Sequence, residues 1–194
     1  MKSPITLLLA ITFSYWASLV SAANVSLPAD SIYQLESTFS DQSGQEFQLA
    51  NRRGKPQLVA MFYTSCKFVC PLIVDSAKGV ERALSLDEKD RLSILLVSMD
   101  PARDDTAALK LIADKRKLDA AHWTLARTDE RGVRKLSALL GVRYRALADG
   151  EFNHTSTLFL LDTQGRKIAS SSQLGGVPEP AFMAAVRAAT QQSD

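Results

Sequence analysis

The stretch Gln57–Pro71, QLVAMFYTSCKFVCP, decides the fold and the chemistry of this chain. Residues 57–63 are an almost unbroken apolar run, which is typical of a strand buried on both faces. A helical pattern begins at Cys70, and Pro71 is acceptable in the first turn of a helix. Cys66 and Cys70 are the 2 cysteines of the chain. The spacing therefore places two sulfur atoms one helical turn apart, where a strand passes into a helix.

Two thiols at such a junction can bind a soft metal, exchange electrons, or do both. The N–H groups of a helix start favour negative charge, and Lys67 adds a cation, so we expect at least one thiol pKa below the ~8.5 of free cysteine. A disulfide across so short a loop adds little stability, so the pair is predicted to be functional. The residue that decides between these options is His154, in the stretch Phe152–Ser156 (FNHTS).

The N-terminal residues are typical of an export signal. Lys2 gives a short positive region, residues 5–20 are mostly apolar, and residues 20–22 (VSA) are small, as a signal peptidase requires. We therefore expect a signal peptide over residues 1–22 and a periplasmic or otherwise extracytoplasmic location. The alternative is an uncleaved membrane anchor, for which the apolar stretch is shorter than the ~20 residues of a typical span.

The remainder, residues 23–194, is long enough for a single domain with its own core. The whole chain carries 23 Lys and Arg against 21 Asp and Glu, a net charge of +2. Basic and acidic residues are mixed, and the densest basic group lies between residues 127 and 145. Because no one-signed patch with aromatics is present, nucleic-acid binding is not expected. The basic group is a solvated surface or, alternatively, a surface for an acidic protein partner.

The rest of the pattern predicts an α/β order. Residues 32–35 and 46–49 flank a strong turn signal at Asp41–Gly44, so we expect an N-terminal β-hairpin. Apolar periodicity predicts further strands at 57–63, 92–98, 123–126, 142–146, 157–161 and 167–169, and helices that begin near residues 70, 104–106, 128–130 and 178–180. This order predicts a central mixed β-sheet flanked by helices.

Four pieces of the chain together resemble the Sco/SenC family of copper-binding proteins, which serve cytochrome c oxidase assembly. They are Gly54–Pro56 before the strand, Tyr63–Pro71 around the cysteines, Val97–Thr106 with its MDP and RDDT sequences, and His154–Ser156 before an apolar strand. The resemblance runs from about Tyr33 to the end of the chain. It implies a thioredoxin-like fold for the single domain.

In that family the two cysteines and the histidine bind one copper ion, so the resemblance implies that Cys66, Cys70 and His154 are copper ligands. Two thiolates suit Cu(I), and imidazole is tolerated by both Cu(I) and Cu(II). The implied function is delivery of copper to the binuclear copper centre of an oxidase subunit or another periplasmic copper protein, or reduction of that centre's thiols. Membrane contact is expected only through a partner or an uncleaved anchor.

An enzyme on the same fold is the alternative, and the sequence leaves that question open. Cys66 and Cys70 would then be the catalytic redox pair of a thiol–disulfide oxidoreductase, or one of them the reactive cysteine of a thiol peroxidase. Thioredoxin-like oxidoreductases usually carry a cis-proline before the strand that faces their cysteines, whereas this chain has no proline from Ala102 to Val177. A peroxidase would need an arginine beside a single reactive cysteine, and no such pairing can be read. The sequence therefore favours metal binding.

The residues between the cysteines depart from the family pattern. Lys67, Phe68 and Val69 stand where the family usually has Pro-Asp-Val. We expect this change to alter the partner surface and the redox behaviour of the site, and to leave the ligand set as it is.

Overall fold

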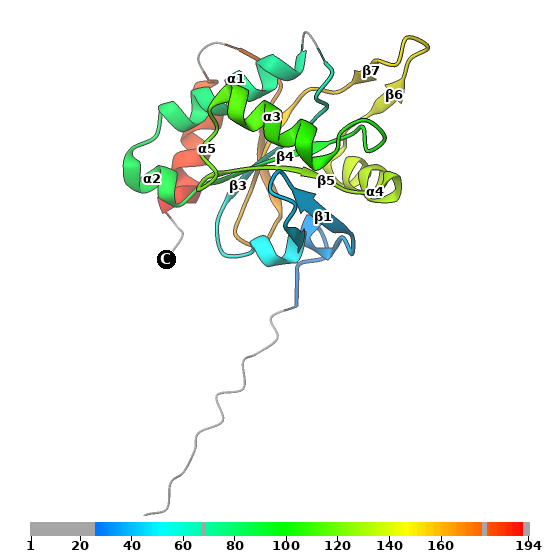
Figure 1. The fold of residues 1–194 in the computed structure, drawn as a ribbon. Helices are drawn as coiled ribbons and strands as arrows, with labels where there is room; N and C mark the ends of the chain where they lie inside the picture. The colour runs from blue at the N-terminus through cyan, green and yellow to red at the C-terminus, as the bar shows by residue number, and fades with distance from the viewer. Residues whose placement is uncertain (1–25, 67–68, 176–177, 192–194) are drawn as a thin grey trace, which may run out of the picture.

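The computed structural model describes residues 26–66, 69–175 and 178–191 (Figure 1). The expected signal peptide over residues 1–22, and the expected influence of Lys67 and Phe68, lie outside these residues. In the part of the chain that is described, no helix combines the length and the apolar character that a membrane crossing requires.

A seven-stranded mixed sheet forms the centre of the described structure, in the strand order β2-β1-β5-β4-β3-β8-β9. The middle strands β3, β4 and β5 are parallel, and β8 is antiparallel to β3. All residues of β3 and β8 are buried, which explains their continuous apolar sequence. The strands are β1 (Thr38–Asp41), β2 (Glu46–Gln48), β3 (Gln57–Phe62), β4 (Ser93–Ser98), β5 (Trp123–Arg127), β8 (Leu158–Leu161) and β9 (Lys167–Ser171).

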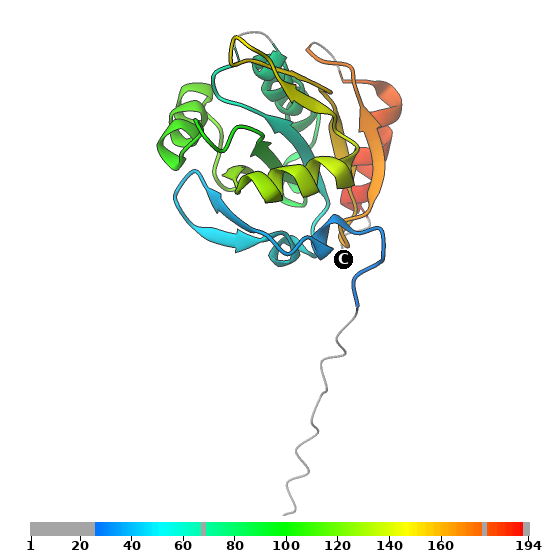
Figure 2. The same ribbon diagram turned by 90° about the vertical axis from the view of Figure 1, so that its right-hand side faces the viewer.

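Helices cover both faces of the sheet. α1, α3 and α5 lie on one face, and α4 crosses the other face (Figures 1 and 2). This follows from the two right-handed crossovers, β3–α1–β4 and β4–α3–β5, which place α1 and α3 on the same side. The helices are α1 (Val69–Arg82), α2 (Leu86–Asp90), α3 (Thr106–Arg116), α4 (Glu130–Leu140) and α5 (Pro180–Gln191).

The start and end signals in the sequence explain the bounds of α3 and α4. The side chain of Asp105 caps α3 by accepting from Ala108 N–H, and that of Asp129 caps α4 by accepting from Gly132 N–H. Gly141 ends α4 in the left-handed region, at a φ of 77°. The predicted starts of both helices are confirmed to within two residues.

The predicted N-terminal hairpin is present, but the prediction of its first strand was wrong. Ile32–Gln34 forms a short 3₁₀ turn, η1, and the strand that pairs with β2 is Thr38–Asp41. The Asp41 carboxylate accepts the N–H groups of Ser43 and Gln45 and closes the turn directly after β1. The residues that flank a closed turn must pair, so the strand adjoins the turn and the earlier apolar residues pack elsewhere.

Two short strands outside the main sheet carry part of the candidate site. β6 (Tyr144–Ala146) and β7 (Phe152–His154) pair antiparallel and form a separate two-stranded sheet, the β6–β7 ribbon (Figure 1). The sequence predicted β6 but not β7. A mixed central sheet flanked by helices, with the N-terminal hairpin at one edge, is the predicted thioredoxin-like fold.

Candidate metal centre

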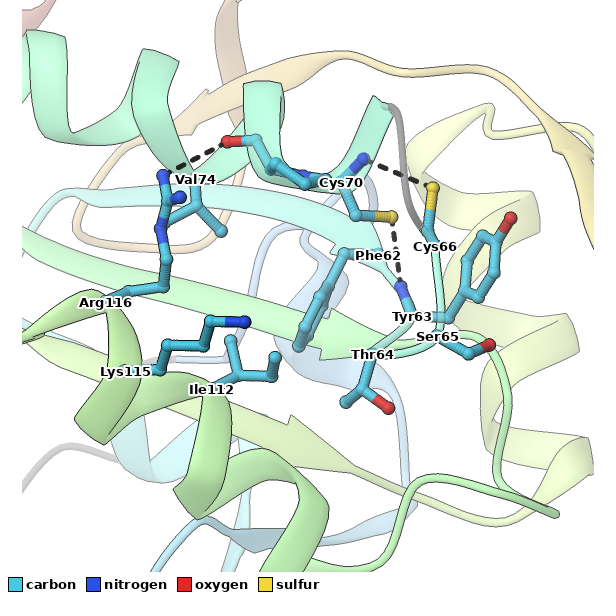
Figure 3. Close-up of a pocket in the computed structure, with 11 residues that line it drawn as sticks. Phe62, Tyr63, Thr64, Ser65, Cys66, Cys70, Val74, Ile112, Lys115 and Arg116 are labelled. Atoms are coloured by element: carbon cyan, nitrogen blue, oxygen red, sulfur yellow. Dashed lines mark hydrogen bonds between the residues drawn. The ribbon is translucent and has the colours of Figure 1, made fainter.

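The loop after β3 brings the two thiols together at the start of α1. Both cysteines are thiols, Cys70 being buried and Cys66 partly exposed. Cys70 N–H donates to the Cys66 sulfur at 3.4 Å, and Tyr63 N–H donates to the Cys70 sulfur at 3.3 Å (Figure 3). The strand-to-helix junction therefore directs backbone N–H groups at both sulfur atoms, as the sequence predicted.

The environment of Cys70 favours the thiol over the thiolate. Burial raises the pKa of Cys70 strongly, and the neighbouring Cys66 raises it further, while the N–H of Tyr63 opposes the shift. Cys70 is therefore not the thiol of lowered pKa that the sequence predicts for at least one of the two cysteines. The physical reason is that Cys70 is only 4% exposed, so desolvation of a thiolate outweighs the hydrogen bond that it receives.

A buried carboxylate fixes the loop that leads to the cysteines. Asp104, which is fully buried, accepts the Thr64 N–H at 3.0 Å and the Thr64 hydroxyl at 2.5 Å. The Ser98 hydroxyl at the end of β4 also donates to it, at 2.5 Å. Asp104 was not among the residues predicted for the site. The available signal was that β3 and β4 are parallel, so that their carboxyl ends meet at one edge of the sheet.

Tyr63 joins the cysteine loop to the β6–β7 ribbon. Its hydroxyl donates to Glu151 Oε2 at 2.8 Å and accepts the Phe152 N–H at 3.4 Å. Burial raises the pKa of Tyr63, and hydrogen bonds with the Cys66 thiol and Glu151 raise it further, so the phenol is neutral. The ring lies edge-on to Phe152 and to His154, with centroids 5.2 and 5.8 Å away. Neither Tyr63 nor Glu151 was predicted as a site residue, and no local pattern signals their contact.

His154 lies at the end of β7 as a neutral imidazole. Its Nδ1 is 3.1 Å from the carbonyl oxygen of Thr155. Because a carbonyl can only accept, Nδ1 carries the hydrogen and Nε2 keeps its lone pair. Burial lowers the pKa of His154 below its usual 6.5, so the ring is uncharged at pH 7. An imidazole in this tautomer can offer Nε2 to a metal while Thr155 holds its orientation.

The three residues that the resemblance implied are not gathered around one point. The structure brings Cys66 and Cys70 together, and it places His154 beside the ring of Tyr63. Within residues 26–66, 69–175 and 178–191, no group of three or more His, Cys, Asp or Glu side chains is arranged to hold a metal ion. Two thiols with a nearby imidazole are nevertheless a donor set that suits copper or zinc.

Comparison with known proteins finds relatives in the SCO1/SenC family. The sequence model of the SCO1/SenC family matches residues 28–190. The SCO1 protein homolog of Bacillus subtilis (strain 168) is 21% identical over 165 residues, which cover 81% of this chain and 83% of that protein.

Solved structures give the same result. The ScoI protein of Bradyrhizobium japonicum, solved with copper bound, is 27% identical, with a TM-score of 0.67, and the match covers 79% of this chain and 96% of that chain. BsSco, described as a Sco family cytochrome c oxidase assembly protein with a disulfide switch, shares the fold at 19% identity, with a TM-score of 0.69 over 80% of this chain and 91% of that one. Because the family model spans far more than half of the sequence, this chain belongs to the SCO1/SenC family.

Proposed function

We propose that this chain is an exported copper-binding protein of cytochrome c oxidase assembly, and that Cys66, Cys70 and His154 are its copper ligands. The observation that carries the proposal is the pair of thiols held side by side at the start of α1, with a neutral imidazole on the adjoining ribbon. The copper in the related ScoI protein supports the choice of metal. The membership of BsSco in an oxidase assembly family supports the biological role.

The donor set explains why such a site can both accept and release copper. Two thiolates are sufficient for Cu(I), which tolerates a nearly linear pair of soft ligands. Nε2 of His154 would add a third ligand that both oxidation states accept. The partly exposed Cys66 leaves one side of the site open, so an incoming ligand from an acceptor protein can reach the metal.

The same thiols can serve as a redox pair. Transfer of two electrons and two protons from Cys66 and Cys70 to a disulfide of the acceptor's copper centre would join the two cysteines as a disulfide, since the Cys66 sulfur already lies 3.4 Å from the backbone nitrogen of Cys70. Because copper requires thiolates, the disulfide and the copper site exclude each other. Oxidation would then switch copper binding off, and reduction would restore it.

The same proposal sets the cellular context. Residues 1–22 act as a signal peptide, and residues 23–194 work as one domain in the periplasm. The partner is a copper-accepting oxidase subunit or another periplasmic copper protein. Membrane contact arises through this partner, or through the N-terminal segment where it stays uncleaved.

Copper content of the reduced, desalted protein tests the ligand set. We expect one copper per wild-type chain and close to none for Cys66→Ser or Cys70→Ser, because each variant removes a soft ligand. Met99→Leu is the matched control, since Met99 also carries sulfur but is buried in the core and 2% exposed; it should keep its copper. Full copper content in Cys70→Ser would contradict the proposal.

A further inference from the structure

A cavity lies beside the cysteines, between the start of α1 and the end of α3. Its volume is about 330 Å³, and both Cys66 and Cys70 line it (Figure 3). Phe62, Val74 and Ile112 give it an apolar wall. Sites for small organic molecules begin near this size and are lined in this way, by apolar groups with a few polar ones. The α1–α3 cavity is therefore large enough for one small molecule placed directly against the sulfur atoms.

The end of the cavity away from Cys66 is positively charged. Lys115 and Arg116, at the end of α3, line it, and no Asp or Glu is among its described lining residues. Arg116 is ion-paired with Asp75, which compensates its charge. Lys115 has no ion-pair partner in the described part of the chain, and its side chain extends toward the cavity centre in Figure 3. An anion bound here would therefore meet an uncompensated ammonium group.

The cavity thus offers three kinds of contact in a row. Sulfur atoms that can undergo exchange lie at one end, apolar side chains lie along the wall, and Lys115 lies at the other end. A ligand that satisfies all three has a reactive sulfur, a short apolar stem and a negative group. A small thiol with a carboxylate is the simplest molecule of this kind.

We propose that the α1–α3 cavity binds small carboxylate-bearing thiols, and that such a thiol reduces the Cys66–Cys70 disulfide. This rests on the redox half of the proposed function. The thiolate attacks the sulfur of Cys66, which is the more exposed of the two, so that a mixed disulfide forms and Cys70 leaves and takes up a proton. A second small thiol attacks the sulfur of the bound one, which releases the disulfide of the two small molecules, and Cys66 leaves as a thiolate and takes up a proton. Two thiols are oxidised for each protein disulfide reduced.

Reduction rates of the oxidised protein by thiols of different charge test the proposal. The thiols are 3-mercaptopropionate, 2-mercaptoethanol and cysteamine, which are anionic, neutral and cationic. Each rate is divided by the rate of the same thiol with 4,4′-dithiodipyridine, a neutral disulfide, to remove intrinsic reactivity. For the wild type we expect the corrected rate of the anionic thiol to exceed that of the neutral thiol by about tenfold, and the cationic thiol to be slowest.

Two charge-reversal variants in α3 test whether Lys115 causes the preference for the anionic thiol. Lys115→Glu should lower the corrected rate of 3-mercaptopropionate by about tenfold and leave that of 2-mercaptoethanol within about twofold. Lys110→Glu is the matched control, because Lys110 is exposed, is paired with Asp114 and does not line the cavity; it should leave both rates within about twofold. Equal effects of the two variants, or equal corrected rates in the wild type, would overturn the proposal.

A second measurement decides the question even where no disulfide forms. Iodoacetate and iodoacetamide both alkylate cysteine, but only iodoacetate carries a carboxylate. We therefore expect the reduced wild-type protein to show the same preference for the anionic reagent, and Lys115→Glu to lose this preference. Copper content distinguishes a failure of the cavity proposal from a failure of the proposed function. One copper per chain without any preference for anions refutes the cavity proposal alone, whereas wild-type protein that binds no copper refutes the proposed function.

Discussion

The neighbours of His154 hold its imidazole in one chemical state. The carbonyl of Thr155 fixes the tautomer, and burial keeps the ring neutral at pH 7. The residue was identified from a family resemblance, because a single histidine in a polar stretch carries no ligand signal of its own. What the structure adds is the chemical state of the ring, which no sequence pattern contains.

Replacement of His154 should separate the two oxidation states of copper. In His154→Ala the two thiolates remain and still satisfy Cu(I), whereas Cu(II) loses its nitrogen ligand. We expect Cu(II) affinity to fall by at least about 10–100-fold, the loss typical when even an outer partner of a metal ligand is removed. Competition with chelators of known affinity measures both values. Equal losses for Cu(I) and Cu(II) would count against His154 as a ligand.

Cys70 should make copper binding depend on pH. Because burial raises the pKa of Cys70 far above neutrality, its thiol keeps the proton between pH 6 and 8 and copper must displace it. Displacement of this proton makes the apparent Cu(I) affinity rise by at least about tenfold for each unit of pH, so binding strengthens as the pH rises. Chelator competition at several pH values measures this slope. An affinity that stays flat from pH 6 to 8 would show that Cys70 is already a thiolate.

At the scale of elements, the loop after β3 depends on a carboxylate from the segment that follows β4. Asp104→Asn leaves one oxygen for the three donors that the carboxylate serves, so a buried donor on Thr64 or Ser98 loses its partner. We expect a loss of about 2 kcal/mol in the free energy of unfolding. Asp105→Asn is the control, because asparagine caps a helix as well as aspartate, and it should change stability by less than about 0.5 kcal/mol. Urea unfolding of the reduced protein compares them; equal losses would remove the special role of Asp104.

The β6–β7 ribbon should loosen when its bond to the cysteine loop is cut. Tyr63→Phe removes the hydroxyl that contacts Glu151 and the Phe152 N–H. The loss of about 1 kcal/mol of hydrogen-bond free energy should make amide hydrogen exchange in β7 about five- to tenfold faster. Exchange in β3 and β4 should not change. Tyr144→Phe is the control, because Tyr144 lies in the same ribbon, opposite His154, and its hydroxyl takes no part in the contacts with Glu151 and the Phe152 N–H. Protection of β7 equal to that of the wild type would show that Tyr63 does not hold the ribbon.

The elements that the sequence predicted are those with a local signal. β3 and α1 follow from one apolar run and one helical period, and α4 from a cap and a terminal glycine. β7 was missed because three half-buried or exposed residues show no clear alternation. The first hairpin strand was misplaced because apolar Ile32–Leu35 lies in a short 3₁₀ turn that packs into the core.

At the scale of the whole molecule, the site also contains one part that a local sequence pattern predicts and another part that only the fold creates. The cysteine pair lies within one stretch of sequence, so its place at a helix start could be predicted. The contacts of Asp104 with Thr64 and of Glu151 with Tyr63 join residues 40 and 88 positions apart. Such contacts depend on which strand ends meet, and therefore follow from the fold and not from local patterns.

The fold also gives the cysteines two different surroundings. Lys115 and Arg116 of the α1–α3 cavity lie on one side of Cys70, and Tyr63 lies on the other (Figure 3). We expect small anionic thiols to approach the sulfur atoms from the side of Lys115, and His154 to approach a bound copper ion from the side of Tyr63, which also lines the cavity. Both processes use the same two sulfur atoms, which line the cavity, so a small thiol bound there and a copper ion would exclude each other.

The central claim is that one copper ion is bound by both cysteines and by His154. X-ray absorption at the copper edge of the reduced, copper-loaded protein tests it most directly, because it counts the sulfur and nitrogen neighbours of the metal. The account predicts two sulfur neighbours and one imidazole nitrogen in the wild type, and two sulfur neighbours without that imidazole in His154→Ala. A spectrum with fewer than two sulfur neighbours, or one that is the same in His154→Ala as in the wild type, would contradict it.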